Sequence, residues 1–234
     1  MKKKSIAIIT ARGGSKRIHK KNIKEFCGKP IIAYSIRAAL NSKIFDEVMV
    51  STDSEEIAEI AIKNGANVPF MRSAKTSDDF ATTSDVLLEV LNRYEEKGMK
   101  FDIMSCIYPT APFVTADKLQ KALDKLYETK ARMVMPVVKF SYPPQRGYIC
   151  NEEWIEMKWK ENYAKRSQDL EQLYHDAGQF YLYDVKEFLK YKGIIMDRIA
   201  PIIVSELEVQ DIDNLTDWKM AELKYKLMTQ MNVK

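Results

Sequence analysis

The first 140 residues alternate short β-branched runs with longer stretches whose apolar residues recur at helical spacing. Strands linked through helices run parallel and are covered on both faces, so this alternation constrains the fold strongly. We therefore predict an α/β fold built on a doubly wound, mostly parallel sheet. The expected strands are 6–10, 47–51, 67–70, 103–108 and 133–138, and the expected helices are 31–40, 55–63, 84–96 and 116–127.

The alternation is interrupted after residue 138. Tyr142-Pro143-Pro144 breaks the rhythm, and residues 148–150 and 154–159 predict two antiparallel strands around a turn at Asn151. The α/β pattern then resumes with strands at 178–183 and 202–207 and a last helix from about Asp217. We interpret the chain as one domain, 1–234, with residues 140–175 as an inserted β-hairpin arm. Such an arm is typical of dimerisation, and a lid is the alternative.

Composition excludes several classes of protein. A hydrophobic fraction of 46% argues against disorder, and a net charge of +4 is too weak to predict a nucleic-acid partner. The apolar run that begins at Ile6 is too short for a signal peptide, and no run approaches the roughly 20 apolar residues of a membrane span. Cys27, Cys106 and Cys150 are scattered, which indicates reduced thiols in a cytoplasmic protein with no membrane partner.

Positive charge is concentrated directly after the first expected strand. Ligands bind at the carboxyl ends of the strands in open parallel sheets, so this segment lies where a ligand is expected. The glycines allow backbone amides to approach a phosphate, and collecting five cations costs repulsion unless an anion relieves it. Neither GxxxxGK[ST] nor GxGxxG is present. A solvated basic loop or a weak RNA contact is the alternative. The residues concerned are Arg12, Gly13, Gly14, Lys16, Arg17, Lys20 and Lys21.

This loop resembles the N-terminal signature of the CMP-sugar-acid synthetases, through residues 11–17 (ARGGSKR), Lys21-Asn22 and residues 28–31 (GKPI). These cytidylyltransferases act on N-acylneuraminate, on the eight-carbon acid Kdo or on pseudaminic acid. The resemblance covers nearly the whole chain, because further motifs follow in the same order. They are 51–53 (STD), Arg72, 108–112 (YPTAP), 166–169 (RSQD), 175–181 (HDAGQFY) and 211–213 (DID).

The resemblance implies a Rossmann-like nucleotidyltransferase that transfers CMP from CTP to the anomeric hydroxyl of a sugar acid. Charge builds on the departing pyrophosphate, so preorganised cations and amides are needed there. Arg12, Lys16, Lys21 and Asp211 are the expected catalytic residues. By resemblance, Arg72 and Thr83 lie beside cytosine and ribose. Without the resemblance, the alternative for Arg72 is a surface ion pair. The expected nucleotide-binding residues are Ala11, Arg12, Gly13, Gly14, Ser15, Lys21, Asn22, Arg72 and Thr83.

Asp211 and Asp213 are separated by one residue in an expected extended segment, so both carboxylates project from the same face. Mg²⁺ prefers one or two carboxylates together with substrate phosphate oxygens, and this pair supplies them. In the alternative interpretation Asp213 caps the final helix, or both residues solvate a turn. The resemblance favours Mg²⁺ as the cofactor.

The resemblance also places a sugar-acid site around two later motifs. His175, Gln179 and Tyr181 could bond sugar hydroxyls, although an isolated histidine is usually a packing or surface residue. Arg166 and Gln168 could hold the substrate carboxylate, by reaching across a homodimer from the arm. The expected substrate-binding residues are Tyr108, Thr110, Arg166, Gln168, His175, Asp176, Gln179 and Tyr181.

One departure concerns the choice of sugar. Neuraminate synthetases typically read QPTSPLR where this chain reads YPTAPFV at residues 108–114, so polar contacts are replaced by aromatic surface. The combined motifs resemble most the branch that acts on pseudaminic acid, a nine-carbon acid. A CMP-N-acetylneuraminate or CMP-legionaminate synthetase is the nearest alternative. A sugar-1-phosphate nucleotidyltransferase and a non-catalytic nucleotide-binding module are the others.

Overall fold

The central sheet of the computed structural model, which describes residues 3–231, has the strand order β11-β6-β10-β5-β1-β4, with β9 paired to β6. Parallel pairing joins β1 to β4, β1 to β5, and β11 to β6. In contrast, β10 runs antiparallel to β5 and β6, and β9 runs antiparallel to β6. The predicted mostly parallel sheet is confirmed. Its strands are β1 (Ser5–Thr10), β4 (Glu47–Ser51), β5 (Ile103–Ile107), β6 (Met133–Lys139), β9 (Tyr174–Asp176), β10 (Phe180–Asp184) and β11 (Ile199–Val204).

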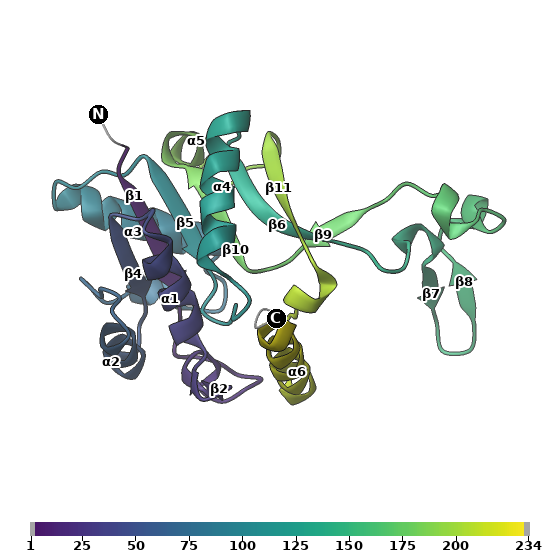
Figure 1. The fold of residues 1–234 in the computed structure, drawn as a ribbon, viewed down its shortest axis with the longest axis horizontal. Helices are drawn as coiled ribbons and strands as arrows, with labels where there is room; N and C mark the ends of the chain where they lie inside the picture. Colours follow the sequence, from purple (N-terminus) through teal and green to yellow (C-terminus); the bar gives the residue numbers. More distant parts are fainter. Residues whose placement is uncertain (1–2, 232–234) are drawn as a thin grey trace.

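Helices cover both faces of this sheet (Figure 1). Along β1, Ala7 and Ile9 face one core and Ile6 and Ile8 face the other, as expected of a strand buried on both sides. No helix within residues 3–231 is long and apolar enough to cross a membrane. Helices α1 (Ile32–Ser42), α2 (Glu55–Lys63) and α4 (Ala116–Thr129) pack on the first core, and α3 (Thr83–Glu96) and α5 (Val185–Lys190) pack on the second.

A third apolar cluster lies beneath the last helix, α6 (Leu215–Met231). Phe26 and Trp218 meet edge to face with ring centroids 5.7 Å apart, and Tyr34 and Tyr225 complete the aromatic group. Ile212 is buried in the same cluster. The cluster therefore fixes the chain just before α6 against the segment that follows the basic loop, which contains the 3₁₀ turn η1 (Lys21–Ile23) and the short strands β2 (Glu25–Phe26) and β3 (Lys29–Pro30).

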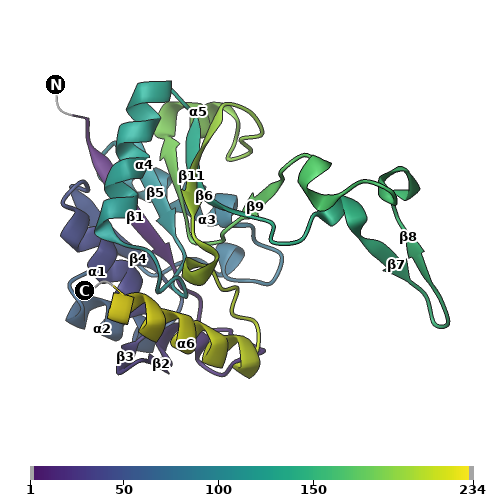
Figure 2. The same ribbon diagram turned by 45° about the vertical axis from the view of Figure 1, so that its right-hand side comes forward.

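The inserted segment contains the predicted hairpin, formed by β7 (Tyr148–Cys150) and β8 (Ile155–Met157). The side chain of Asn151 accepts a hydrogen bond from the backbone N–H of Trp154, which closes the turn. The hairpin projects away from the sheet (Figures 1 and 2). Tyr148, Trp154 and Tyr163 are largely exposed on it, so the segment buries little of its own apolar surface. Its role in dimerisation stays a prediction. Its 3₁₀ turns are η3 (Pro144–Arg146), η4 (Lys160–Asn162) and η5 (Ser167–Asp169).

Two sequence expectations need correction. Residues 67–70 do not form a strand: only Asn67 pairs with Met49, and Pro69 has no N–H to continue the ladder. The strand expected at 202–207 instead ends at Val204, because Ser205 caps the 3₁₀ turn η6 (Glu206–Glu208). Ser54 and Thr115 cap α2 and α4 through their side chains. A further 3₁₀ turn, η2 (Ala74–Thr76), precedes α3.

Candidate active site

The carboxyl ends of β1, β4 and β5 meet at one edge of the sheet, because these strands run parallel. The antiparallel β10 begins at this same edge, where Phe180 pairs with Ile107. A cavity of about 510 Å³ opens there, a size typical of small-molecule sites. Its lining residues are Thr10, Arg12, Ser15, Lys16, Arg17, Ile18, Lys21, Asn22, Arg72, Thr76, Asp78, Asp79, Ala81, Thr83, Val86, Tyr108, Pro109 and Thr110.

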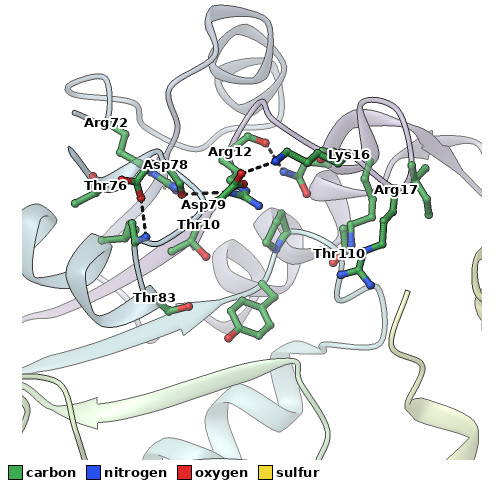
Figure 3. A pocket seen from close by; sticks show the side chains of 18 residues that line it. Thr10, Arg12, Lys16, Arg17, Arg72, Thr76, Asp78, Asp79, Thr83 and Thr110 are labelled. Carbon is green, nitrogen blue, oxygen red and sulfur yellow. Dashed lines mark hydrogen bonds and ion pairs between the residues drawn. The ribbon is translucent and has the colours of Figure 1, made fainter. Parts of the chain in front are cut away.

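This cavity brings together residues that the sequence predicted from three distant motifs. Arg72 and Thr83 lie on one side and Lys16 and Thr110 on the other, with Arg12 between them (Figure 3). Ala11 is fully buried beneath the loop. The predicted residues that line the cavity are Arg12, Ser15, Lys16, Lys21, Asn22, Arg72, Thr83, Tyr108 and Thr110.

The basic loop is held in place by its own polar contacts. The backbone N–H of Gly13 donates to the Asp53 carboxylate at 2.8 Å, and the Asn22 amide donates to the carbonyl of Arg12 at 2.8 Å. A Cβ added at Gly13 would lie 3.2 Å from the Cβ of Ser54, so a larger residue would push the loop from α2. The amides of Gly13 and Asn22 therefore shape the loop here, in addition to the phosphate contacts predicted for it.

An acidic residue that the sequence analysis missed faces the loop. Arg12 forms an ion pair with Asp79 at 2.9 Å, and the ammonium of Lys16 bonds the other carboxylate oxygen of Asp79. The hydrogen bond from Lys16 is the largest of several influences that lower the pKa of Asp79. The two cations thus already bind an anion of the chain itself (Figure 3). Asp79 lies in the stretch between the isolated bridge at Asn67 and helix α3, and the sequence carried no signal for this contact.

Arg72 approaches the cavity from the far side. Its guanidinium donates to the Ser51 carbonyl at 2.5 Å and to the Ser51 hydroxyl at 3.1 Å. Burial lowers the pKa of Arg72, partly offset by Asp53 and Glu89. The alternative of a surface ion pair for Arg72 is therefore wrong. The side chain is anchored at the end of β4, and Thr83 begins α3 on the same side of the cavity.

Two contacts tie the segment that contains Asp211 and Asp213 to the basic loop, and neither aspartate lines the cavity. Lys21 donates to the carbonyl of Ile212 at 2.7 Å, and Arg17 forms an ion pair with Asp213 at 2.5 Å. Burial lowers the pKa of Lys21, while Asp213 and Asp211 raise it. Both carboxylates thus lie near cations of the basic loop.

The alternative role of Asp213 as a helix cap is not supported. Asn214 precedes α6, and its side chain accepts from the backbone N–H groups of Thr216 and Asp217. Among residues 3–231, no group of three or more His, Cys, Asp or Glu side chains is arranged to hold a metal. Two carboxylates suit Mg²⁺ that is shared with substrate phosphates, because the phosphates and water complete such a site. The residue types at 211 and 213 fit that arrangement, which needs no preformed cage.

The predicted sugar-contacting residues lie beside the cavity. The rings of Tyr108 and Tyr181 meet edge to face with centroids 5.6 Å apart, and the Tyr181 hydroxyl donates to Asp176 at 2.5 Å. Burial and this hydrogen bond raise the pKa of Tyr181, so the phenol stays protonated at neutral pH. His175 is exposed and its ring lies 4.7 Å from that of Phe140, centroid to centroid. Of the predicted substrate-binding residues, Tyr108 and Thr110 line the cavity, and His175, Asp176 and Tyr181 do not.

Three predicted residues point elsewhere. Gln179 is buried, and its side chain donates to the backbone carbonyl of Glu208. Arg166 pairs with Asp169 at 2.8 Å on the arm, and Gln168 lines a separate hollow near Phe140. None of the three lines the cavity at the carboxyl ends of β1, β4 and β5.

The fold and the cavity define an α/β protein with a small-molecule site at the carboxyl ends of its parallel strands. The sequence model described as Cytidylyltransferase matches residues 6–205, and the chain belongs to that family. A pseudaminic acid cytidylyltransferase of Campylobacter jejuni is 40% identical over 96% of this chain and 97% of that protein. A CMP-N,N'-diacetyllegionaminic acid synthase of Legionella pneumophila is 30% identical over 93% of this chain and 94% of that protein.

Solved structures support the same fold. A CMP:2-keto-3-deoxy-manno-octonic acid synthetase complexed with CTP superposes with a TM-score of 0.70 at 18% identity, covering 97% of this chain and 99% of that one. A 4-diphosphocytidyl-2C-methyl-D-erythritol synthase from Anaerococcus prevotii gives a TM-score of 0.64 at 16% identity, over 96% and 99% of the two chains.

The contacts of Asp79 generate a prediction about nucleotide binding. An Asp79→Asn variant should bind CTP several-fold more tightly, because its neutral amide competes less with phosphate for Arg12 and Lys16. Isothermal titration of CTP without an acceptor sugar measures this. A Glu128→Gln variant, which removes the same charge from an exposed position on α4, should bind like wild type. Weaker CTP binding by Asp79→Asn would mean that the carboxylate assists the nucleotide rather than competing with it.

Proposed function

We propose that this chain transfers CMP from CTP to the anomeric hydroxyl of pseudaminic acid in the cytoplasm, and releases pyrophosphate. The observation that carries the proposal is the 40% identity, over nearly the full length of both chains, to a pseudaminic acid cytidylyltransferase. The family assignment and the cavity at the carboxyl edge of the sheet agree with it. Three free cysteines, Cys27, Cys106 and Cys150, are consistent with a reducing compartment.

In this proposal the triphosphate lies along the basic loop. The sugar oxygen forms a bond to the α-phosphorus while the bond to the departing pyrophosphate breaks. Arg12, Lys16 and Lys21 neutralise the charge that the pyrophosphate gains, because their cations are already arranged on one loop. This role requires Arg12 and Lys16 to exchange the Asp79 carboxylate for phosphate oxygens. Arg72 and Thr83, at the opposite side of the cavity, hold cytosine and ribose.

Asp211 and Asp213 would hold Mg²⁺ together with phosphate oxygens of CTP. When bound, Mg²⁺ supplies charge neutralisation and acidifies the attacking hydroxyl. The ion pair between Arg17 and Asp213 holds one of these carboxylates close to the basic loop. Lys21 bonds the backbone between them, which keeps both within reach of the phosphates. Asp211 is exposed to solvent and lies near the ammonium of Lys21.

The acceptor would lie next to the Tyr108–Tyr181 pair. Aromatic surface at this place suits pseudaminic acid, which carries a methyl group where neuraminate carries a terminal hydroxyl. The terminal hydroxyl of neuraminate would be desolvated against the aromatic rings of Tyr108 and Tyr181 without gaining a hydrogen-bond partner. Neuraminate should therefore be a poor substrate. The principal rival is CMP-legionaminate synthesis, which the Legionella relative at 30% identity supports less strongly.

A panel of acids decides between these substrates. With CTP and Mg²⁺, the enzyme should release pyrophosphate fastest with pseudaminic acid, more slowly with legionaminic acid, and least with N-acetylneuraminic acid. Coupled pyrophosphate release at matched concentrations gives kcat/KM for each acid. Preference for N-acetylneuraminic acid would overturn the assignment of the acceptor and leave the family assignment intact.

Replacing a proposed metal-holding carboxylate separates chemistry from nucleotide binding. Asp211→Asn should lower kcat by at least about 100-fold, because Mg²⁺ loses a ligand when the transition state forms. CTP binding in EDTA, measured by titration calorimetry, should remain near the wild-type value. Asp124→Asn, an exposed change on α4, serves as the control. Turnover of Asp211→Asn close to wild type would rule out its role.

We also propose that the chain works as a homodimer whose arm supplies Arg166 and Gln168 to the partner's cavity. The exposed aromatic side chains of the arm support this, because such a surface is costly in water unless a partner covers it. Arg166 is exposed and lies outside the main cavity of its own chain. A residue of this kind can bind substrate only if another copy brings its cavity to it.

Mixing two inactive variants tests the shared site. Arg166→Ala and Asp211→Asn should each be nearly inactive alone. After co-refolding in equal amounts they should regain about a quarter of wild-type activity, because mixed dimers contain one intact site. Sedimentation equilibrium should give twice the chain mass of 27.1 kDa. A monomeric wild type, or no recovery on mixing, would contradict the shared site.

A further inference from the structure

A buried cation outside the cavity links two segments of the proposed active site. Lys118 lies in the first turn of α4, and only 9% of its surface is exposed. Its ammonium donates to the carbonyl of Phe113 at 3.0 Å and forms an ion pair with Glu208 at 2.8 Å. One ammonium therefore binds both the loop that follows β5 and the turn η6 that follows β11.

A lysine at position 118 is unfavourable for helix α4 considered by itself. A cation near a helix N-terminus is unfavourable, because the helix dipole is positive there. Burial also lowers the pKa of Lys118, and Glu208 opposes that shift. Neither helix propensity nor hydrophobic packing explains a lysine here. Its ammonium instead connects the Phe113 carbonyl to the Glu208 carboxylate, and this connection accounts for the lysine.

Other long side chains hold the same turn. The buried Gln179 donates to the backbone carbonyl of Glu208, and its own backbone carbonyl accepts from Tyr108 at 2.9 Å. Lys224 of α6 donates to the carbonyl of Val209 at 2.7 Å. The side chain of Glu208 also reaches back to the N–H of Ser205 at 3.3 Å. The chain from 205 to 209 is thus bonded by Gln179, just before β10, by Lys118 of α4 and by Lys224 of α6, shortly before it reaches Asp211.

We propose that Lys118 is a positioning residue for the Asp211–Asp213 carboxylates. Through Glu208 the ammonium fixes the position of the 205–213 segment. Through Phe113 it fixes that segment relative to the loop containing Tyr108 and Thr110. The proposed metal-binding carboxylates and the proposed acceptor site are thereby held in a constant position relative to each other. This inference rests on the proposed function, because it assumes that Asp211 and Asp213 hold the cation.

Loosening this link should weaken metal binding without altering the nucleotide pocket. Side chains that orient metal ligands typically change affinity by about 10-fold or more when replaced. In Lys118→Met, the dissociation constant of Mn²⁺, used as a paramagnetic probe and followed by electron paramagnetic resonance, should rise by about that factor in the presence of CTP. No acceptor is added, so turnover does not enter the measurement. CTP binding in EDTA should match wild type.

A second variant separates positioning from folding. Lys118→Met leaves Glu208 unpaired and should lower Tm, whereas Lys118→Met with Glu208→Gln removes both charges and should recover much of the lost Tm. We expect the double variant to bind Mn²⁺ as weakly as the single one, because the link is still absent. Lys121→Met, one turn along α4 and exposed, is the control and should bind Mn²⁺ like wild type.

The possible results point to different conclusions. If the double variant binds Mn²⁺ like wild type, Lys118 only supports folding, and the positioning role is overturned. If wild type itself binds no Mn²⁺ in the presence of CTP, the metal assignment fails, and the positioning role fails with it. Weak Mn²⁺ binding in both Lys118 variants, with unchanged CTP binding and an intact control, supports the inference.

Discussion

Parallel pairing of β1 with both β4 and β5 is the constraint on which the rest of this structure depends. Because the three strands point the same way, their carboxyl ends and the loops that leave them meet at one edge. The basic loop after Thr10, the Ser51 carbonyl that anchors Arg72, and Tyr108 all reach the cavity for this reason. The antiparallel β10 then brings the Asp176–Tyr181 contact to the same edge.

At this edge of the sheet, carboxylates of the chain pair with the positive charges of the basic loop. Asp79 pairs with Arg12 and Lys16, and Asp213 pairs with Arg17, so these three cations of the basic loop have carboxylate partners within the chain. These pairs are exposed, so each contributes little to stability. In the proposed reaction, a triphosphate, which brings more charge than either carboxylate, would replace these partners at small cost.

The polar link through Lys118 differs from these exchangeable pairs. It is largely buried, and it joins segments that are close only in the folded chain. Breaking one partner of such a pair is costly, because the other charge remains desolvated. A buried link that resists change suits a positioning role. Exposed pairs that exchange readily suit the phosphate end of the site. In the proposed function, the buried Lys118–Glu208 pair thus suits fixed positioning, and the exposed pairs of the basic loop suit exchange for phosphate.

The sequence by itself determined the mostly parallel α/β architecture, the β7–β8 hairpin and the basic loop, because hydrophobic period, proline placement and charge density are local properties. It did not determine the structure of residues 67–70, where Asn67 pairs with Met49 but Pro69 has no N–H to continue the ladder. The pairing of Asp79 with Arg12, 67 residues away along the chain, had no local signal.

Tertiary structure alone decided which predicted residues share a cavity. It gathered Arg72 and Thr83 with the basic loop, and it left Arg166 on the arm and Gln179 in the interior. Spacing along a chain reports which residues share a face of one strand or helix. Which loops meet depends on strand order and direction, and those follow from packing the whole chain.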